Sequence, residues 1–212
     1  MSSQNRRYEL KARAESQAQT RERIVRATMD LHQEVGPAHT TVAEIARRAG
    51  VQRLTVYNHF PEEAELFGAC QAHWMSLHPM PDLSAAFATS DDPGARVRAV
   101  LRDIYSWYRE TESMAEKVQR DRGAVAALDA LLHQTADAGL GQIADALAGG
   151  FPRGRGRAAE RRRALIGLAV DFWTWRRLDR EGLDDATAAE TMAEAVAGAT
   201  PPRSPSRPGK IP

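Results

Sequence analysis

The stretch from Thr41 to Phe60 reads TVAEIARRAGVQRLTVYNHF, and its signals describe two short helices joined by a tight turn. Thr41 can act as the N-cap of the first helix, and Glu44, three residues later, can complete a capping box. Gly50 supplies the left-handed backbone conformation that most residues avoid, so the first helix is expected to end there. A second helix can begin around Gln52. The sequence therefore predicts a helix-turn-helix.

The second helix has two different faces when its residues are sorted by the 3.6-residue period. Val56 falls on an apolar side, together with residues of the first helix. The opposite side carries a guanidinium, a large aliphatic group, a phenol and an amide, from Arg53, Leu54, Tyr57 and Asn58. Such a stripe suits a DNA groove, which displays hydrogen-bond acceptors, donors and thymine methyls. For the bare pattern, a solvated helix with a stray Leu and Tyr is the alternative.

The sequence around this motif resembles a known family. The segments RERIVRATMDLHQEVG, TTVAEIARRAGVQRLTVYNHFP and ELFGACQAHW follow one another in order. They make residues 20–77 similar to the DNA-binding domain of the TetR family of bacterial transcriptional regulators. The resemblance implies base contacts from Arg53, Leu54 and Tyr57, with Gln52 able to meet a base or a phosphate. It implies phosphate contacts from Thr41, Thr55, Asn58 and His59.

Two positions depart from the family pattern. Family members often carry a lysine after the Phe-Pro pair, whereas Glu62 and Glu63 stand there in this chain. Acidic residues favour a helix N-terminus but repel DNA, so we expect a weaker phosphate contact at this turn, with Arg47, Arg48 or the N-terminal arm supplying charge instead. Leu54 replaces a smaller residue or proline, which leaves the preferred operator sequence open.

Charge is distributed unevenly along the 212 residues. The formal net charge is only +1, which argues against a histone-like polycation. Residues 1–60, however, hold ten Lys or Arg against six acidic residues, an excess of four. This modest positive charge on the DNA-binding side predicts salt-dependent binding.

Other function classes find little support in the sequence. No phosphate-binding glycine loop, nucleophile elbow or zinc-protease motif occurs, so we expect neither an enzyme nor a bound cofactor. Cys70, His73 and His78 could be spaced for a metal, although packing residues on an amphipathic helix are the more common case. The single cysteine, the absence of a long apolar run and the polar start predict a cytoplasmic protein without a membrane span.

The remainder of the chain shows helical periodicity and no strand pattern, which predicts an all-α fold. We expect helices over residues 20–35, 62–77, 94–109, 111–118, 122–147, 158–179 and 185–198, with a loop at 79–93. A kink is expected near Gly139 and Gly141. The arginine-glycine stretch at 153–157 suits a linker better than a nucleic-acid contact.

These elements predict four segments. Residues 1–19 would form a mobile basic arm, 20–78 the helix-turn-helix DNA-binding domain, 79–199 a helical effector-binding and dimerisation domain, and 200–212 a disordered tail. By resemblance, the last two helices would pair with their copies in a homodimer that binds a pseudo-palindromic double-stranded operator. Completing the core of a monomer is the alternative role for these two helices.

A small-molecule effector is implied by the family and by a set of aromatic residues. The candidates for its pocket are Trp74, Trp107, Tyr108, Met114, Phe172 and Trp173. Ordinary core packing is the alternative for each of them. The function expected from the sequence is a repressor released from its operator by an apolar ligand. A constitutive or partner-controlled DNA-binding regulator is the other possibility, and a metal sensor is a third.

Overall fold

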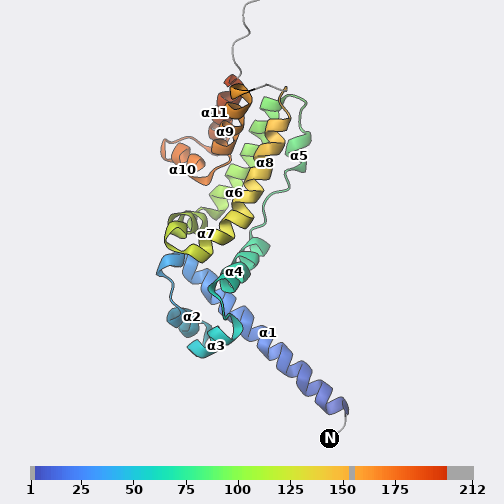
Figure 1. Cartoon of the computed structure of the whole chain (residues 1–212), viewed down its shortest axis with the longest axis vertical. Helices are drawn as coiled ribbons and strands as arrows, with labels where there is room; N and C mark the ends of the chain where they lie inside the picture. Colours follow the sequence, from blue (N-terminus) through green and yellow to red (C-terminus); the bar gives the residue numbers. More distant parts are fainter. Residues whose placement is uncertain (1–2, 153–155, 200–212) are drawn as a thin grey trace, which may run out of the picture. The chain divides into compact units, whose positions relative to one another are not determined.

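Helices are the only regular elements in the part of the chain that the structure describes, as the periodicity predicts (Figure 1). The computed structural model describes residues 3–152 and 156–199, and only the backbone of residues 3–7. The predicted tail at 200–212 and residues 153–155 of the predicted linker lie outside the described residues.

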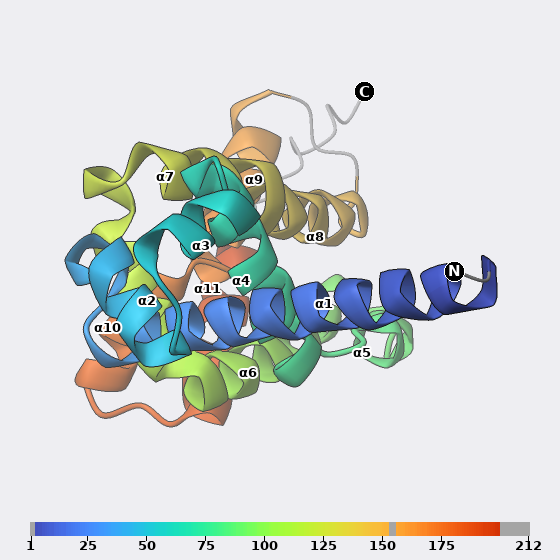
Figure 2. The same ribbon diagram turned by 90° about the horizontal axis from the view of Figure 1, so that it is seen from below.

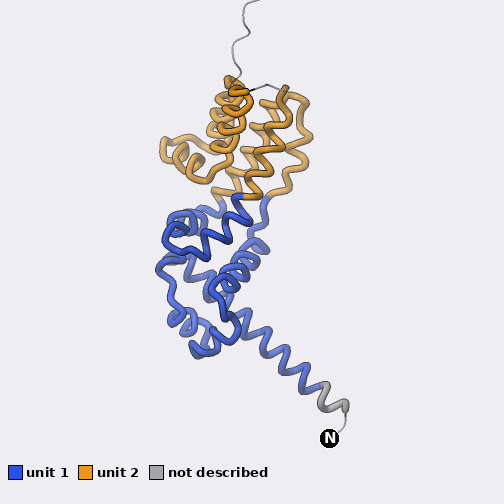
Figure 3. The backbone as a smooth tube through the Cα atoms, in the orientation of Figure 1, with its two compact units in different colours: residues 1–80, 110–137 blue, residues 81–109, 138–212 orange. Residues whose placement is uncertain are grey.

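The chain forms two compact units (Figure 3). Unit 1 consists of residues 1–80 and 110–137, and unit 2 of residues 81–109 and 138–212. The chain first passes from unit 1 to unit 2 after residue 80, close to the expected domain boundary at residue 78. Residues 110–137, in contrast, belong to the same unit as the helix-turn-helix, although their sequence position places them in the second half of the chain.

The first helix, α1 (Ser3–Glu34), begins well before Thr20, where the sequence analysis placed its start. Residues 3–19 contain no Gly or Pro and are rich in Ala, Glu, Arg and Gln, which favour helices. Their described side chains are exposed, so this segment shows no apolar stripe by which periodicity could reveal it. Figures 1 and 2 show α1 continuing past α2, α3 and α4 toward the N-terminus.

The C-terminal half of α1 forms the core of the helix-turn-helix region with α2 (Val42–Ala49), α3 (Arg53–His59) and α4 (Glu63–Leu77). A short 3-10 turn, η1 (Pro37–His39), follows α1. The buried residues of this core are Ile24, Val25, Ala27, Leu31, Ile45, Ala46, Ala49, Val56, Phe60 and Leu66. They come from all four helices and the end of α3, so each helix has one side fixed by burial.

The middle of the chain is divided differently from the prediction. α5 (Ser84–Ala88) occupies part of the predicted loop. α6 (Pro93–Asp121) is one helix, where we expected two. The polar run at 110–113 suggested a break, but Thr111 is buried and continues the apolar stripe from Tyr108 to Met114.

The predicted helix at 122–147 is divided into successive helical segments of different pitch. They are η2 (Arg122–Ala124), α7 (Ala126–Leu132), the π turn η3 (His133–Asp137) and α8 (Ala138–Gly149). The irregularity lies just before Gly139 and not at the glycines, which are inside α8. Arg122 bonds Asp129 and Asp137, each at 2.8 Å, and so stabilises the widened turn between them.

The predicted helix at 158–179 is two helices, α9 (Arg157–Ala169) and α10 (Phe172–Arg180). Asp171 ends the first and caps the second, because its carboxylate accepts hydrogen bonds from the backbone N–H groups of Trp173 and Thr174. The apolar run around Asp171 hid this cap in the sequence. α11 (Asp185–Gly198) has the predicted bounds and is capped by Asp184.

Candidate nucleic-acid interface

The helix α3 presents the side chains that the sequence assigns to DNA bases. Leu54 is 66% exposed and Tyr57 51% exposed, and Arg53 and Gln52 are also exposed. Val56, on the opposite side, is 1% exposed. The helix thus has an anchored apolar side and an outward side that carries two large apolar or aromatic groups in solvent. Exposed groups of this size on a short helix are typical of a binding surface.

The turn before α3 fixes the direction of this helix. Gly50 is left-handed, with φ 66° and ψ 41°, and its N–H and that of Val51 bond back to carbonyls of α2. Thr41 caps α2 through a hydrogen bond from the Glu44 N–H to its hydroxyl at 3.2 Å. Both features follow from local sequence, so the sequence could predict the motif closely.

Three of the four predicted phosphate-binding residues line one concave surface between α1 and α3. Its residues are Gln17, Ala18, Arg21, Thr55, Asn58 and His59. The Arg21 guanidinium lies over the Phe60 ring, 4.2 Å from its centroid, which places a cation at the edge of α3. The fourth residue, Thr41, is exposed at the start of α2.

Sequence reasoning missed Gln17 and Arg21 as candidate contacts. A signal was present, because extending the buried stripe of α1 backward from Leu31 through Thr28 and Ile24 reaches Arg21 and Gln17 at helical spacing. The same stripe that holds α1 against the core therefore continues as a polar stripe beside α3.

The arginines at the end of α2 differ in their surroundings. Arg48 forms a bidentate ion pair with Glu34, with distances of 2.5 and 2.7 Å, and this pairing lowers the pKa of Glu34. Arg47 is exposed and has no ion pair within the described residues. Of the two arginines expected to supply charge, Arg47 is the one whose guanidinium is available.

Residues behind the interface form a buried polar cluster in unit 1. Nδ1 of His32 lies 3.6 Å from Sγ of Cys70, and burial lowers the pKa of His32 to about 4 and raises that of Cys70 to about 12. Asp121 accepts a hydrogen bond from the Ala38 N–H at 3.1 Å, while Arg120 donates to both Asp121 and the Val35 carbonyl. Burial alone would raise the pKa of Asp121, but these donors hold it below its usual value.

The spacing of Cys70, His73 and His78 does not produce a metal-binding group. Among the described residues, no three His, Cys, Asp or Glu side chains lie together as a metal site would need. Cys70 is instead packed against His32 in the core.

The candidate effector residues are divided between the units. Trp74 and Met114 belong to unit 1, where Met114 is buried and the Trp74 ring lies 4.0 Å from that of His78. The other four belong to unit 2. They form a connected aromatic cluster, with ring centroids 5.6 Å apart for Trp107 and Tyr108, 5.4 Å for Tyr108 and Phe172, and 5.3 Å for Phe172 and Trp173.

Trp175 is an aromatic residue of this cluster that sequence reasoning missed. It is fully buried, its ring contacts both Tyr108 and Phe172, and its indole N–H donates to Asp185 at 2.9 Å. Trp175 faces inward because the chain changes direction between α9 and α10. The single helix expected at 158–179 did not predict this orientation. Trp173, by contrast, is 39% exposed.

The fold and the site define an all-helical protein with an amino-terminal helix-turn-helix whose second helix faces outward. Residues 24–70 match the family described as bacterial regulatory proteins, tetR family. The HTH-type transcriptional regulator TtgR of Pseudomonas putida is 37% identical over 95 residues, which make up 43% of this chain and 44% of that protein. Over residues 24–70, the chain therefore has an amino-terminal domain of the type found in the tetR family of bacterial regulatory proteins.

Solved structures of the family share the fold. NalD of Pseudomonas aeruginosa, described as the secondary repressor of the MexAB-OprM multidrug efflux pump, aligns with a TM-score of 0.56 at 23% identity, over 87% of this chain and 97% of that one. A tetR-family transcriptional regulator from Streptomyces coelicolor aligns with a TM-score of 0.56 at 23% identity, over 85% and 79%. The proteins that this chain resembles are regulators and not enzymes.

The sequence match to the curated relative covers less than half of its length, 44%. The family match over residues 24–70 contains α2 and α3, whereas the described helices continue to Gly198. No helix within residues 3–152 and 156–199 has the length and apolar character needed to cross a membrane.

Proposed function

We propose that this chain is a homodimeric transcriptional regulator that binds a pseudo-palindromic operator through α3. The observation that carries the proposal is the division of α3 into a buried side, at Val56, and an outward side with Arg53, Leu54 and Tyr57. A guanidinium can bond guanine, an aliphatic group can meet a thymine methyl, and a phenol can do either. Residues 20–78 would be the DNA-binding domain.

The phosphate contacts of this proposal come from two helices. Thr55, Asn58 and His59 on α3 share a concave surface with Gln17 and Arg21 on α1. Phosphate contacts set the position of a protein on the duplex, while base contacts specify the sequence. Arg21 therefore would fix the register in which α3 enters the major groove.

The dimer would form through the last helices of the chain, α9 and α11. Leu168 on α9 is 56% exposed, which leaves a large apolar side chain available for a partner. On α11, Ala188 and Val196 are buried within unit 2, whereas Ala195 is exposed and Met192 is half-buried. Small and apolar groups at the open side of α11 permit close approach of a second copy.

The proposed regulation is repression relieved by a small apolar effector in the domain at 79–199, inside the cytoplasm. The cluster of Trp107, Tyr108, Phe172 and Trp173 supports this proposal, because its connected rings would form an aromatic wall for such a ligand. NalD, which shares the fold, is described as a repressor. An effector must bind one conformation better than the other, since equal affinity shifts no equilibrium.

Selection of genomic fragments by the purified chain tests the DNA-binding proposal. The expected result is enrichment of sites with two inverted half-sites, with centres about 34 to 36 Å apart or a multiple of that distance. Fragments enriched without symmetry would contradict binding as a dimer. With the operator known, a panel of hydrophobic compounds tests the effector, and unchanged operator affinity across the panel would favour constitutive or partner-controlled regulation.

A further inference from the structure

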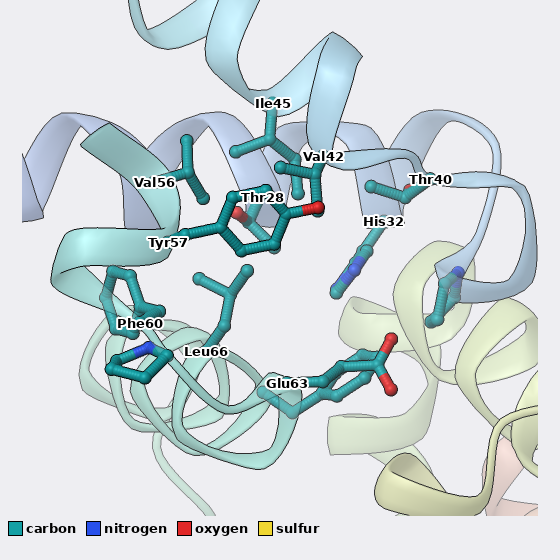
Figure 4. Close-up of a pocket in the computed structure, with 13 residues that line it drawn as sticks. Thr28, His32, Thr40, Val42, Ile45, Val56, Tyr57, Phe60, Glu63 and Leu66 are labelled. Atoms are coloured by element: carbon teal, nitrogen blue, oxygen red, sulfur yellow. The ribbon is translucent and has the colours of Figure 1, made fainter. Parts of the chain in front are cut away.

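A cavity of about 270 Å³ lies inside the helix-turn-helix region, between α1, α2, α3 and α4 (Figure 4). It is separate from the aromatic residues considered for an effector, none of which lines it. Its lining residues are Thr28, His32, Pro37, Thr40, Val42, Ile45, Val56, Tyr57, Phe60, Pro61, Glu63, Leu66 and Phe67. All of them belong to unit 1.

The walls of the cavity are mainly apolar and aromatic. Phe67 stacks on His32 with ring centroids 5.3 Å apart and planes inclined by 23°. Leu66 and Ile45 are buried and contribute aliphatic surface. The ring of Tyr57 closes one side (Figure 4). A flat ring placed here would meet aromatic faces and aliphatic groups.

Two hydroxyl groups in the wall already have hydrogen-bond partners, whereas one ring nitrogen of His32 has none. The hydroxyl of Thr28 donates to the Ile24 carbonyl at 2.8 Å, and that of Thr40 donates to the Gly36 carbonyl at 2.9 Å. His32 is 5% exposed and its ring points into the cavity (Figure 4). Its Nδ1 contacts Cys70, while Nε2 has no hydrogen-bond partner among the described residues.

The charge of the cavity is set by Glu63. It is the one acidic residue in the lining, it is exposed at the first turn of α4, and no Lys or Arg accompanies it there. His32 adds no positive charge near neutral pH, because burial lowers its pKa to about 4. The cavity therefore combines an apolar interior with a negative rim.

We propose that this cavity binds a small organic cation built on one aromatic ring, with the ring against Phe67 and His32 and the ammonium group at Glu63. Pockets for drug-sized ligands measure about 300 to 1,000 Å³, so this smaller cavity suits a single-ring compound. Tyr57 contributes an aromatic face toward which a cation is attracted.

A ligand in this position contacts the helix proposed to read DNA. Tyr57 lines the cavity and also stands on the outward face of α3. Any effect of the ligand on operator affinity rests on the proposed function, and linkage requires DNA to change ligand affinity by the same factor. Binding to the protein without DNA does not rest on it, so that is what the experiment measures.

Isothermal titration of the full chain with phenethylammonium tests the site. We expect saturable binding with one ligand per chain, and weaker binding of the neutral phenethyl alcohol and of the anion phenylpropanoate. Glu63→Gln should weaken phenethylammonium binding about threefold to fivefold, the size of one solvent-exposed ion pair. Glu65→Gln is the matched control, because Glu65 is also exposed in the first turn of α4 but does not line the cavity.

A second variant tests the location without removing charge. Val42→Phe places a larger side chain at the cavity wall and should abolish binding. Equal affinity of the Glu63→Gln and Glu65→Gln variants, or unchanged binding by Val42→Phe, would overturn the proposal. So would an absence of binding by the parent chain. If Val42→Phe fails to fold, the comparison of the two glutamate variants decides the matter.

Discussion

Gly36 is the residue at which backbone geometry and packing constrain the chain together. Its φ of 95° and ψ of 158° lie in a region that only glycine adopts readily. A methyl group on Gly36 would also meet the carboxylate of Asp121 and the guanidinium of Arg120. Gly50 has a positive φ as well, but its surroundings are open. A substitution at Gly50 therefore introduces backbone strain alone, whereas the same substitution at Gly36 introduces backbone strain and a steric conflict.

Gly36→Ala should lower the free energy of unfolding by about 3 kcal/mol or more, because strain of about 1 to 3 kcal/mol adds to the conflict with Asp121. Gly50→Ala should cost only about 1 to 2 kcal/mol, the penalty of a left-handed alanine. Denaturant unfolding of the full chain measures both values. Equal losses in the two variants would contradict the steric conflict assigned to Gly36.

His32 gives unit 1 a dependence on pH. Its pKa is about 4 in the folded chain and 6.5 in the reference state, so the unfolded chain takes up the proton first as pH falls. Stability should decrease from about pH 6.5 downward and continue to decrease until about pH 4. When the pH falls from about 7 to about 5, protonation of this one ring in the unfolded chain should lower the free energy of unfolding by about 2 kcal/mol.

The variant His32→Met removes this titration while keeping an apolar side chain of similar size. Its free energy of unfolding should fall less than that of the parent between about pH 7 and about pH 5, by about the same 2 kcal/mol. Urea unfolding at the two pH values tests this. A parallel decrease in parent and variant would show that the buried ring is not responsible.

At the scale of elements, the break between α9 and α10 depends on two tyrosines of α6. The hydroxyl of Tyr105 donates to the Ala169 carbonyl and that of Tyr108 to the Val170 carbonyl, each at 2.7 Å. These carbonyls lie at the end of α9, where the helix offers them no partner. Burial raises the pKa of both phenols, so they stay protonated and remain hydrogen-bond donors at neutral pH.

Tyr108→Phe should lower the free energy of unfolding by about 1 to 3 kcal/mol, because it leaves a buried carbonyl without a donor. Tyr8→Phe is the control, since Tyr8 is 73% exposed and its variant should match the parent. Thermal or urea unfolding gives the comparison. A Tyr108→Phe variant as stable as the parent would remove the role assigned to this hydrogen bond.

The elements show which parts of the fold local sequence can predict. α2, α3 and their turn were predictable because the residues that define them are close together in the sequence. Thr41 caps α2, Gly50 ends it, and Val56 marks the buried side of α3. The extension of α1 was missed because residues 3–19 have helix-forming side chains but no apolar face. The cap at Asp171 was hidden in an apolar run, and the place of Arg21 beside α3 depends on tertiary packing.

For the whole molecule, the proposed phosphate contacts at the surface between α1 and α3 predict a dependence of operator affinity on salt. Arg21→Gln should weaken binding across all duplexes and reduce the slope of log affinity against log salt by about 1 for each phosphate that residue 21 no longer neutralises. Arg23→Gln is the control, because Arg23 is exposed on α1 but does not line that surface. Fluorescence anisotropy across a salt series measures the slopes, and equal slopes for the two variants would refute the phosphate-binding role of Arg21.

The role of the outward face of α3 is tested most directly by comparing affinity for the selected operator with affinity for a scrambled duplex of equal length. For Arg53→Ala and Tyr57→Ala, we predict a decrease in operator preference equivalent to about 1 to 3 kcal/mol per base contact. Because both side chains are exposed, melting temperature and affinity for the scrambled duplex should stay close to those of the parent. Full operator preference in both variants would contradict the assignment of α3 as the helix that reads DNA.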